Sequence, residues 1–149
     1  MTHLLDINVL VALFDAAHGH HEAAHRWFAQ VGRVAWATCP ITENGVVRVL
    51  SNPAYPTVSA RPSEVVERLR VFCAQSGHAF WSDAVSLTDA ALFDTSQLRG
   101  HQQITDLYLA GVAARYGGRL ATFDSAIPTA ALVNAPADIV VLIPAVSVP

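Results

Sequence analysis

The apolar positions of this chain form short continuous runs that alternate with segments of helical period. The continuous runs predict strands at residues 3–5, 34–38, 119–123 and 139–143, with further extended candidates at 79–81 and 86–87. The periodic segments predict helices at residues 8–14, 20–31, 41–50, from 62 onwards, and 104–116. Residues 88–103 show no regular pattern. Strands that alternate with helices are typical of a parallel sheet with helices on its faces, so we expect an α/β fold.

Composition limits the classes of protein that fit. The chain has 149 residues, enough for one domain, and its 14% of charged residues and 52% of apolar residues exclude a disordered protein. The net charge is −3 and all nine basic residues are arginine, so binding of nucleic acid would need a local site. The two cysteines, Cys39 and Cys73, are too few and too far apart in the sequence to predict a disulfide framework or a thiolate metal site. A membrane span needs ~20 apolar residues, and no run reaches that length, so we expect a cytoplasmic protein.

The placement of four acidic residues is the main chemical signal. Asp6 and Asp124 each follow directly after a predicted strand. Glu43 and Asp106 each lie in the first turn of a predicted helix, and the helix of Glu43 follows a strand. Ligands of open parallel sheets bind at the carboxyl ends of the strands, so these four side chains are expected to share one edge.

Carboxylates gathered at one edge repel each other, and proteins tolerate this mainly where a divalent cation supplies positive charge. Ligand sets made only of oxygen favour Mg²⁺ or Mn²⁺, which assist hydrolysis of phosphodiesters. The pattern therefore favours a metal-dependent nuclease or phosphatase. The alternative is structural: Glu43 and Asp106 can stabilise helix N-termini, and Asp6 and Asp124 can be turn residues at strand ends.

Several segments together resemble the PIN-domain ribonucleases, and specifically the VapC-type toxins of VapBC (type II) toxin–antitoxin modules. The opening segment reads LLDINVLVAL at residues 4–13. The later segments follow in the order of that family: 21–28, then ITE at 41–43, ITDLYL at 104–109 and LATFD at 120–124. The resemblance spans nearly the whole chain. It implies a three-layer α/β/α sandwich, with a central parallel sheet of five strands, in a single PIN domain over residues 1–149.

The resemblance also implies roles for individual residues. Asp6 and Asp106 would be the principal ligands of Mg²⁺ or Mn²⁺, and Glu43 and Asp124 would complete a catalytic and metal-binding quartet. Asn8 and Thr122 would steady the ligands, as residues around a metal site commonly do. Candidates for contacts with RNA phosphates are Arg48, Arg99, Arg115 and Arg119.

The activity implied is that of an endoribonuclease that hydrolyses RNA phosphodiester bonds and acts as the toxic component of its module. The implied partners are the RNA substrate, a cognate VapB-type antitoxin and a second copy of the chain, without a membrane. An alternative from a different class is a catalytically idle PIN-like module that only binds RNA or protein.

A competing motif reads HEAAH at residues 21–25, which matches the pattern of zinc proteases. In such enzymes the two histidines, here His21 and His25, bind zinc and the glutamate, here Glu22, is the general base. The further ligands that this class requires are missing from the sequence. The other histidines that we considered, His78 and His101, are expected in solvated loops. The tryptophans lie on apolar patterns and are expected in the core or at an interface.

Overall fold

The computed structural model describes residues 1–145 and contains one parallel sheet of five strands. The strands lie in the order β3-β2-β1-β4-β5. Their bounds are β1 (His3–Leu5), β2 (Trp36–Thr38), β3 (His78–Phe80), β4 (Arg119–Thr122) and β5 (Val140–Leu142). The predicted α/β class is confirmed. The strand predicted at 34–38 starts two residues later, because residues 32–34 form a 3₁₀ turn, and residues 86–87 are not a strand.

Five α-helices connect or cover the strands. Each begins within two residues of its prediction and, apart from the helix from residue 62, for which no end was predicted, each also ends within two residues of it. They are α1 (Ile7–Phe14), α2 (His21–Gln30), α3 (Pro40–Leu50), α4 (Pro62–Cys73) and α5 (Ile104–Arg115). Short 3₁₀ helices lie at η1 (Gly32–Val34), η2 (Thr95–Gln97), η3 (His101–Gln103) and η4 (Thr129–Ala131). Within residues 1–145, no helix combines the length and the apolar character needed to cross a bilayer.

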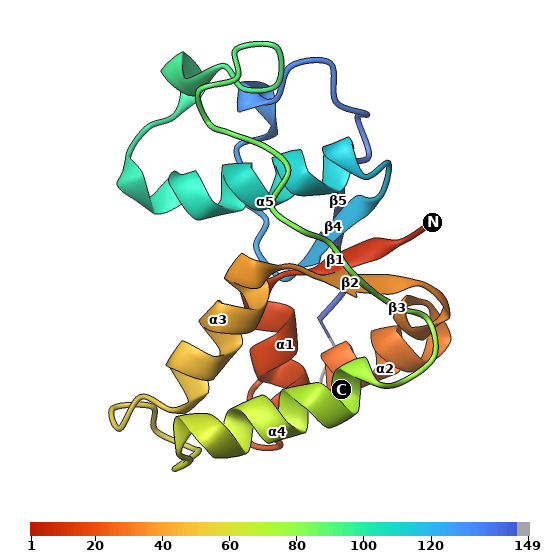
Figure 1. Ribbon diagram of the computed structural model, residues 1–149, viewed down its shortest axis with the longest axis vertical. Coiled ribbons are helices and arrows are strands. Elements are labelled where there is room, and N and C mark those ends of the chain that lie inside the picture. The colour runs from red at the N-terminus through yellow and green to blue at the C-terminus, as the bar shows by residue number, and fades with distance from the viewer. Residues whose placement is uncertain (146–149) are drawn as a thin grey trace.

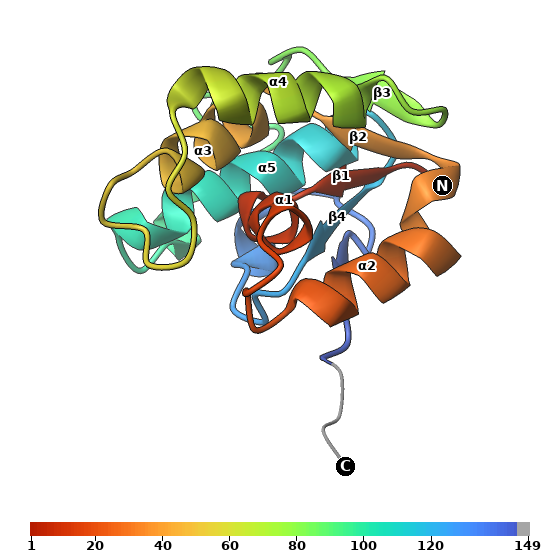
Figure 2. The same ribbon diagram turned by 90° about the horizontal axis from the view of Figure 1, so that it is seen from below.

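The sheet separates two hydrophobic cores, because successive strand residues point to opposite faces. Leu5, Trp36 and Ala121 face α1, α2, α3 and α4. Leu4, Ala37 and Leu120 face α5 and the segment that precedes it. Figure 1 shows the resulting three layers, with α5 on one side of the sheet, and Figure 2 shows the other four helices on the near side when the molecule is seen from below.

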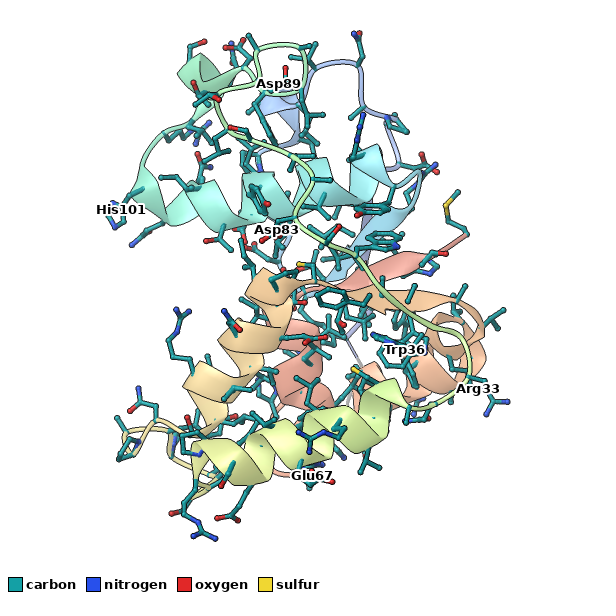
Figure 3. All side chains as sticks on the ribbon, viewed as in Figure 1. Arg33, Trp36, Glu67, Asp83, Asp89 and His101 are labelled. Atoms are coloured by element: carbon teal, nitrogen blue, oxygen red, sulfur yellow. The ribbon has the colours of Figure 1, made fainter. Side chains whose placement is uncertain are left out.

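Trp36 is the largest side chain with no solvent exposure, and it organises the core beneath α4. Its ring lies 4.5 Å from that of Phe72 and 5.3 Å from that of Phe28, measured between centroids. Figure 3 shows Trp36 inside this layer, whereas Arg33 and Glu67 project outward. The prediction that the tryptophans are structural is confirmed for this residue.

Two glycines allow helices to approach their neighbours closely. A Cβ atom at Gly45 of α3 would lie 2.4 Å from Cδ1 of Ile7, so this glycine lets α3 pack directly on the start of α1. A Cβ atom at Gly111 of α5 would lie 2.3 Å from the Phe93 ring. Phe93 belongs to the segment that rises from β3 over α5 in Figure 1 and pairs with Leu132 in an isolated bridge. These contacts fix α1, α3 and α5, the helices that carry or adjoin the predicted acidic residues.

Candidate active site and metal centre

Asp6 lies at the junction of β1 and α1, where the parallel sheet presents its carboxyl edge. Its side chain caps α1 by accepting a hydrogen bond from the Ile7 amide at Oδ1, 2.7 Å away. The other oxygen, Oδ2, accepts a hydrogen bond from the Thr122 hydroxyl at 2.8 Å. The residue is only 5% exposed, and this burial raises the pKa of its carboxyl group, with the charge of Asp124 adding to the effect.

Thr122, at the end of β4, links Asp6 to two further polar residues. Its hydroxyl accepts hydrogen bonds from Asn8 Nδ2 at 3.1 Å and from the Asp124 amide at 3.0 Å. The side-chain oxygen Oδ1 of Asn8 in turn accepts a hydrogen bond from the Phe123 backbone amide at 3.2 Å. Asn8 therefore reaches Asp6 through Thr122, and this network holds the ends of β1 and β4 in a fixed relation.

Asp106, in the first turn of α5, completes a group of three carboxylates, which we call the aspartate centre: Asp6, Asp106 and Asp124. Burial, the charges of Asp6 and Asp124, and a hydrogen bond with Asp124 raise the pKa of Asp106 to about 6. The effects of Asp6 and Asp124 are those expected when carboxylates approach each other.

Within residues 1–145, no basic side chain forms an ion pair with the aspartate centre. The ion pairs found among residues 1–145 join Arg61 to Glu64, Arg70 to Glu67, and Arg119 to Asp138. All ligands that the aspartate centre offers are carboxylate oxygens, which suit Mg²⁺ or Mn²⁺. The donor set and the mutual repulsion of its members therefore fit a hard divalent cation.

Glu43 follows the carboxyl end of β2 as predicted, but its side chain takes part in other contacts. Its Oε2 accepts a hydrogen bond from the Thr38 hydroxyl at 2.6 Å. The alternation of β2 places Thr38 on the same face as Trp36, which is the face covered by α4. Glu43 is not among the charges that act on Asp6 or Asp106. The structure thus brings three of the four predicted residues together and directs Glu43 towards a separate cluster.

That cluster consists of Glu43, Cys73 and His78, whose potential metal-ligating atoms all lie within 4.8 Å of one another. His78 Nε2 lies 2.8 Å from the Thr38 hydroxyl, and burial raises the pKa of the Cys73 thiol to about 11. The expectation that His78 is a solvated loop residue is wrong: it begins β3 and packs its ring 4.6 Å from that of Trp36. The sequence offered one clue to this position, because His78 directly precedes the extended segment predicted at residues 79–81. The observed strand begins one residue earlier, at His78.

The HEAAH motif is structural. His21 Nδ1 lies 2.7 Å from the Ala12 carbonyl oxygen, and His25 Nε2 lies 3.0 Å from that of Leu13. These carbonyls belong to the last turn of α1, where the helix supplies no partners of its own. The two histidines therefore satisfy the C-terminus of α1, and Glu22 is exposed to solvent. Nothing here supports a zinc protease.

The four candidate arginines differ in their surroundings. Arg119 begins β4, at the opposite end of that strand from Asp124, and its guanidinium pairs with Asp138 at 2.9 Å. It is therefore not free to bind a phosphate near the aspartate centre. Arg48, Arg99 and Arg115 are exposed.

A parallel five-stranded sheet that presents carboxylates at its carboxyl edge, with helices on both faces, defines the class: a PIN-like α/β domain. The chain belongs to the PIN domain family, whose pattern matches residues 3–132. The predicted family is therefore confirmed.

Relatives of known name agree with this assignment. Ribonuclease VapC39 of Mycobacterium tuberculosis is 46% identical over 131 residues, which cover 88% of this chain and 94% of the relative. Ribonuclease VapC44 of the same species is 40% identical over 138 residues, covering 91% and 94%. The crystal structure of VapC20 from M. tuberculosis, described as a sarcin-ricin loop cleaving toxin, superposes with a TM-score of 0.61 at 13% identity, covering 89% of this chain and 98% of that one. At that identity the likeness supports the fold alone.

Proposed function

We propose that this protein is a Mg²⁺- or Mn²⁺-dependent endoribonuclease and the toxic component of a type II toxin–antitoxin system. The observation that carries the proposal is the aspartate centre, where burial and the charges of Asp6 and Asp124 raise the pKa of Asp106 to about 6 and where no ion pair with a basic side chain is found within residues 1–145. The names of the two relatives, both ribonucleases, support the same activity.

Asp6 and Asp106 are the proposed principal ligands of the cation. A divalent ion bound there supplies positive charge for the phosphate and makes a water nucleophilic near neutral pH. Asp6 is oriented for this role because the Ile7 amide and the Thr122 hydroxyl fix its two oxygens separately. Asp106 comes from a different helix, so the two ligands approach the ion from α1 and α5.

Asp124 is the proposed residue that orients the attacking water and accepts its proton. Its backbone is held by Thr122, and its Oδ1 accepts a hydrogen bond from the Ala126 amide at 2.8 Å, which leaves Oδ2 for other partners. Glu43 is proposed as the fourth member of the quartet. To join the aspartate centre it has to leave Thr38, so its contribution depends on a change of side-chain rotamer.

The direct test is cleavage of total cellular RNA by the purified full-length protein with Mg²⁺ or Mn²⁺. We expect discrete fragments that disappear with EDTA and with Asp6→Asn, a change that keeps the size of the side chain. Asp89→Asn, at an exposed loop position, is the matched control and retains cleavage. Cleavage by Asp6→Asn at the rate of the unmodified protein would refute the assigned site. A protein that binds the cation and leaves all RNA intact would favour the idle binding module.

Family membership also supports two partners: a cognate VapB-type antitoxin and a second copy of the chain. The antitoxin is proposed to cover the aspartate centre, and the homodimer to cover part of the apolar surface. Light scattering after size-exclusion chromatography tests the homodimer, because a monomeric mass at micromolar concentration would contradict it. Co-expression with a candidate VapB-type antitoxin tests the other partner, with restored growth as the expected result.

A further inference from the structure

We propose that Glu43, Cys73 and His78 form a second metal site, which takes a single thiophilic divalent cation of the zinc class. The three residues come from α3, α4 and β3, and their potential ligand atoms lie within 4.8 Å of one another. We call this group the thiol cluster. It is distinct from the aspartate centre in chemistry, because it offers sulfur and nitrogen as well as oxygen.

The three side chains converge on one point in space. The Thr38 hydroxyl oxygen lies 2.6 Å from Glu43 Oε2 and 2.8 Å from His78 Nε2. A potential ligand atom of Cys73 lies within 4.8 Å of those of both residues. Ligand atoms around a tetrahedral zinc ion lie ~3.5 Å apart, given bonds of about 2.0–2.3 Å. The thiol cluster therefore needs a closing movement on the order of 1 Å to reach that geometry.

Packing against the core holds His78 and Cys73 in place. His78 lies against Trp36 on the strand next to that of Thr38, and Cys73 is the last residue of α4 and packs against the core that contains Trp36. All three members of the cluster are only partly buried. A cleft of about 270 Å³, lined by Glu43 and Cys73 together with Val66, Leu69 and Arg70, gives access from solvent. The Arg70 guanidinium is paired with Glu67 and does not occupy the cluster.

The ligand types identify the class of cation. A thiolate and an imidazole favour Zn²⁺ and related ions, whereas Mg²⁺ and Mn²⁺ prefer ligand sets of oxygen alone. The neutral imidazole has one nitrogen with a free lone pair, and exchange between its tautomers lets Nε2 face the ion. Three protein ligands leave a fourth position, which suits a water molecule or Thr38.

The test is a titration of the metal-free, untagged full-length protein with Co²⁺, the spectroscopic substitute for zinc. We expect a sulfur-to-cobalt charge-transfer band that saturates at a single ion per chain and is displaced by Zn²⁺. Thiolate absorption is the chosen readout because the histidines of residues 18–25 cannot produce it. Cys73→Ser removes the band, and His78→Ala weakens Co²⁺ binding by at least ~10-fold.

Matched variants make the outcome decisive. Cys39→Ala removes the other cysteine, which lies in the opposite core, and retains the band, as does Asp6→Asn in the aspartate centre. Absence of the band in the unmodified protein overturns the proposal, and so does its persistence in Cys73→Ser. Thermal melting of each variant verifies that it is folded, and His78→Ala gives a second reading should Cys73→Ser unfold.

A consequence for activity rests on the proposed function. Glu43 is a proposed ligand of both centres and can serve only one at a time, so Zn²⁺ in the thiol cluster withholds it from the aspartate centre. Micromolar Zn²⁺ is then expected to inhibit Mg²⁺-dependent cleavage by the unmodified protein more strongly than cleavage by Cys73→Ser. Equal inhibition of the unmodified protein and of Cys73→Ser by Zn²⁺ overturns the proposed link between the thiol cluster and activity. A complete lack of RNA cleavage refutes the proposed function instead, while the cobalt spectrum still decides the thiol cluster.

Discussion

Replacing Asp106 by asparagine should stabilise the metal-free protein at neutral pH. Asp106 has a pKa of about 6 in the folded protein, against an ordinary value of 3.8, because of its burial and the charges of Asp6 and Asp124. Between these values the folded chain holds more protons at this site than the unfolded chain. The free energy of unfolding therefore decreases as the pH rises through this window, and the penalty is complete above it.

The size of the effect follows from the shift. Each pKa unit corresponds to about 1.4 kcal/mol, so a shift of about two units gives an upper bound of about 3 kcal/mol. Asp106 is partly accessible to solvent, and screening reduces this to about 1–2 kcal/mol. Asp106→Asn removes the charge and keeps the shape, so the variant should gain that amount at neutral pH, or about 2–8 °C in melting temperature.

The assay is urea unfolding with EDTA at about pH 4.5 and about pH 7.5, comparing the unmodified protein with Asp106→Asn. The difference between the two proteins should be about a third of its full size at the lower pH, which lies inside the window, and reach its full size at the higher pH. Asp89→Asn serves as the control for removal of an exposed carboxylate, and Figure 3 shows Asp89 at the far end of the molecule from α4. A difference that does not change with pH, or a variant that is less stable at neutral pH, would refute the electrostatic account of the aspartate centre.

Three further predictions concern the residues around the site. Thr122→Val removes the hydroxyl that holds Asp6 and should lower Mg²⁺ affinity ~10–100-fold in calorimetric titrations, while Thr129→Val, at an exposed position, leaves it unchanged. His21→Ala should lower the free energy of unfolding by about 1 kcal/mol in urea without changing metal content, because it leaves the Ala12 carbonyl without its partner; a loss of bound zinc would contradict this. Gly111→Ala should destabilise by about 1–3 kcal/mol through collision with Phe93, and adding Phe93→Leu should recover part of the loss.

Local patterns in the sequence suffice to predict the fold class and the edge of the sheet that carries the aspartate centre. The alternation of strands and helices is a local property of the sequence. The spacing of apolar residues and the residues that end a helix can both be recognised within a single segment. Asp6 and Asp124 follow strands directly, and parallel strands bring their carboxyl ends to one edge whatever the remaining details. Their place at one edge of the sheet could therefore be predicted, whereas the pairing of β1 with β4, which brings them close together, is a property of the folded sheet.

The directions of the longer side chains depend on contacts that form in the folded chain. Glu43 lies at the predicted edge, but its rotamer is set by the hydroxyl of Thr38, which the sequence does not place relative to it. Cys73 and Arg119 likewise owe their partners to segments that meet only in the folded chain. The same holds for the HEAAH motif, whose histidines bind α1 carbonyls rather than zinc. Backbone geometry follows from local pattern, whereas the partner of a flexible polar side chain depends on which groups three-dimensional packing brings within hydrogen-bonding distance.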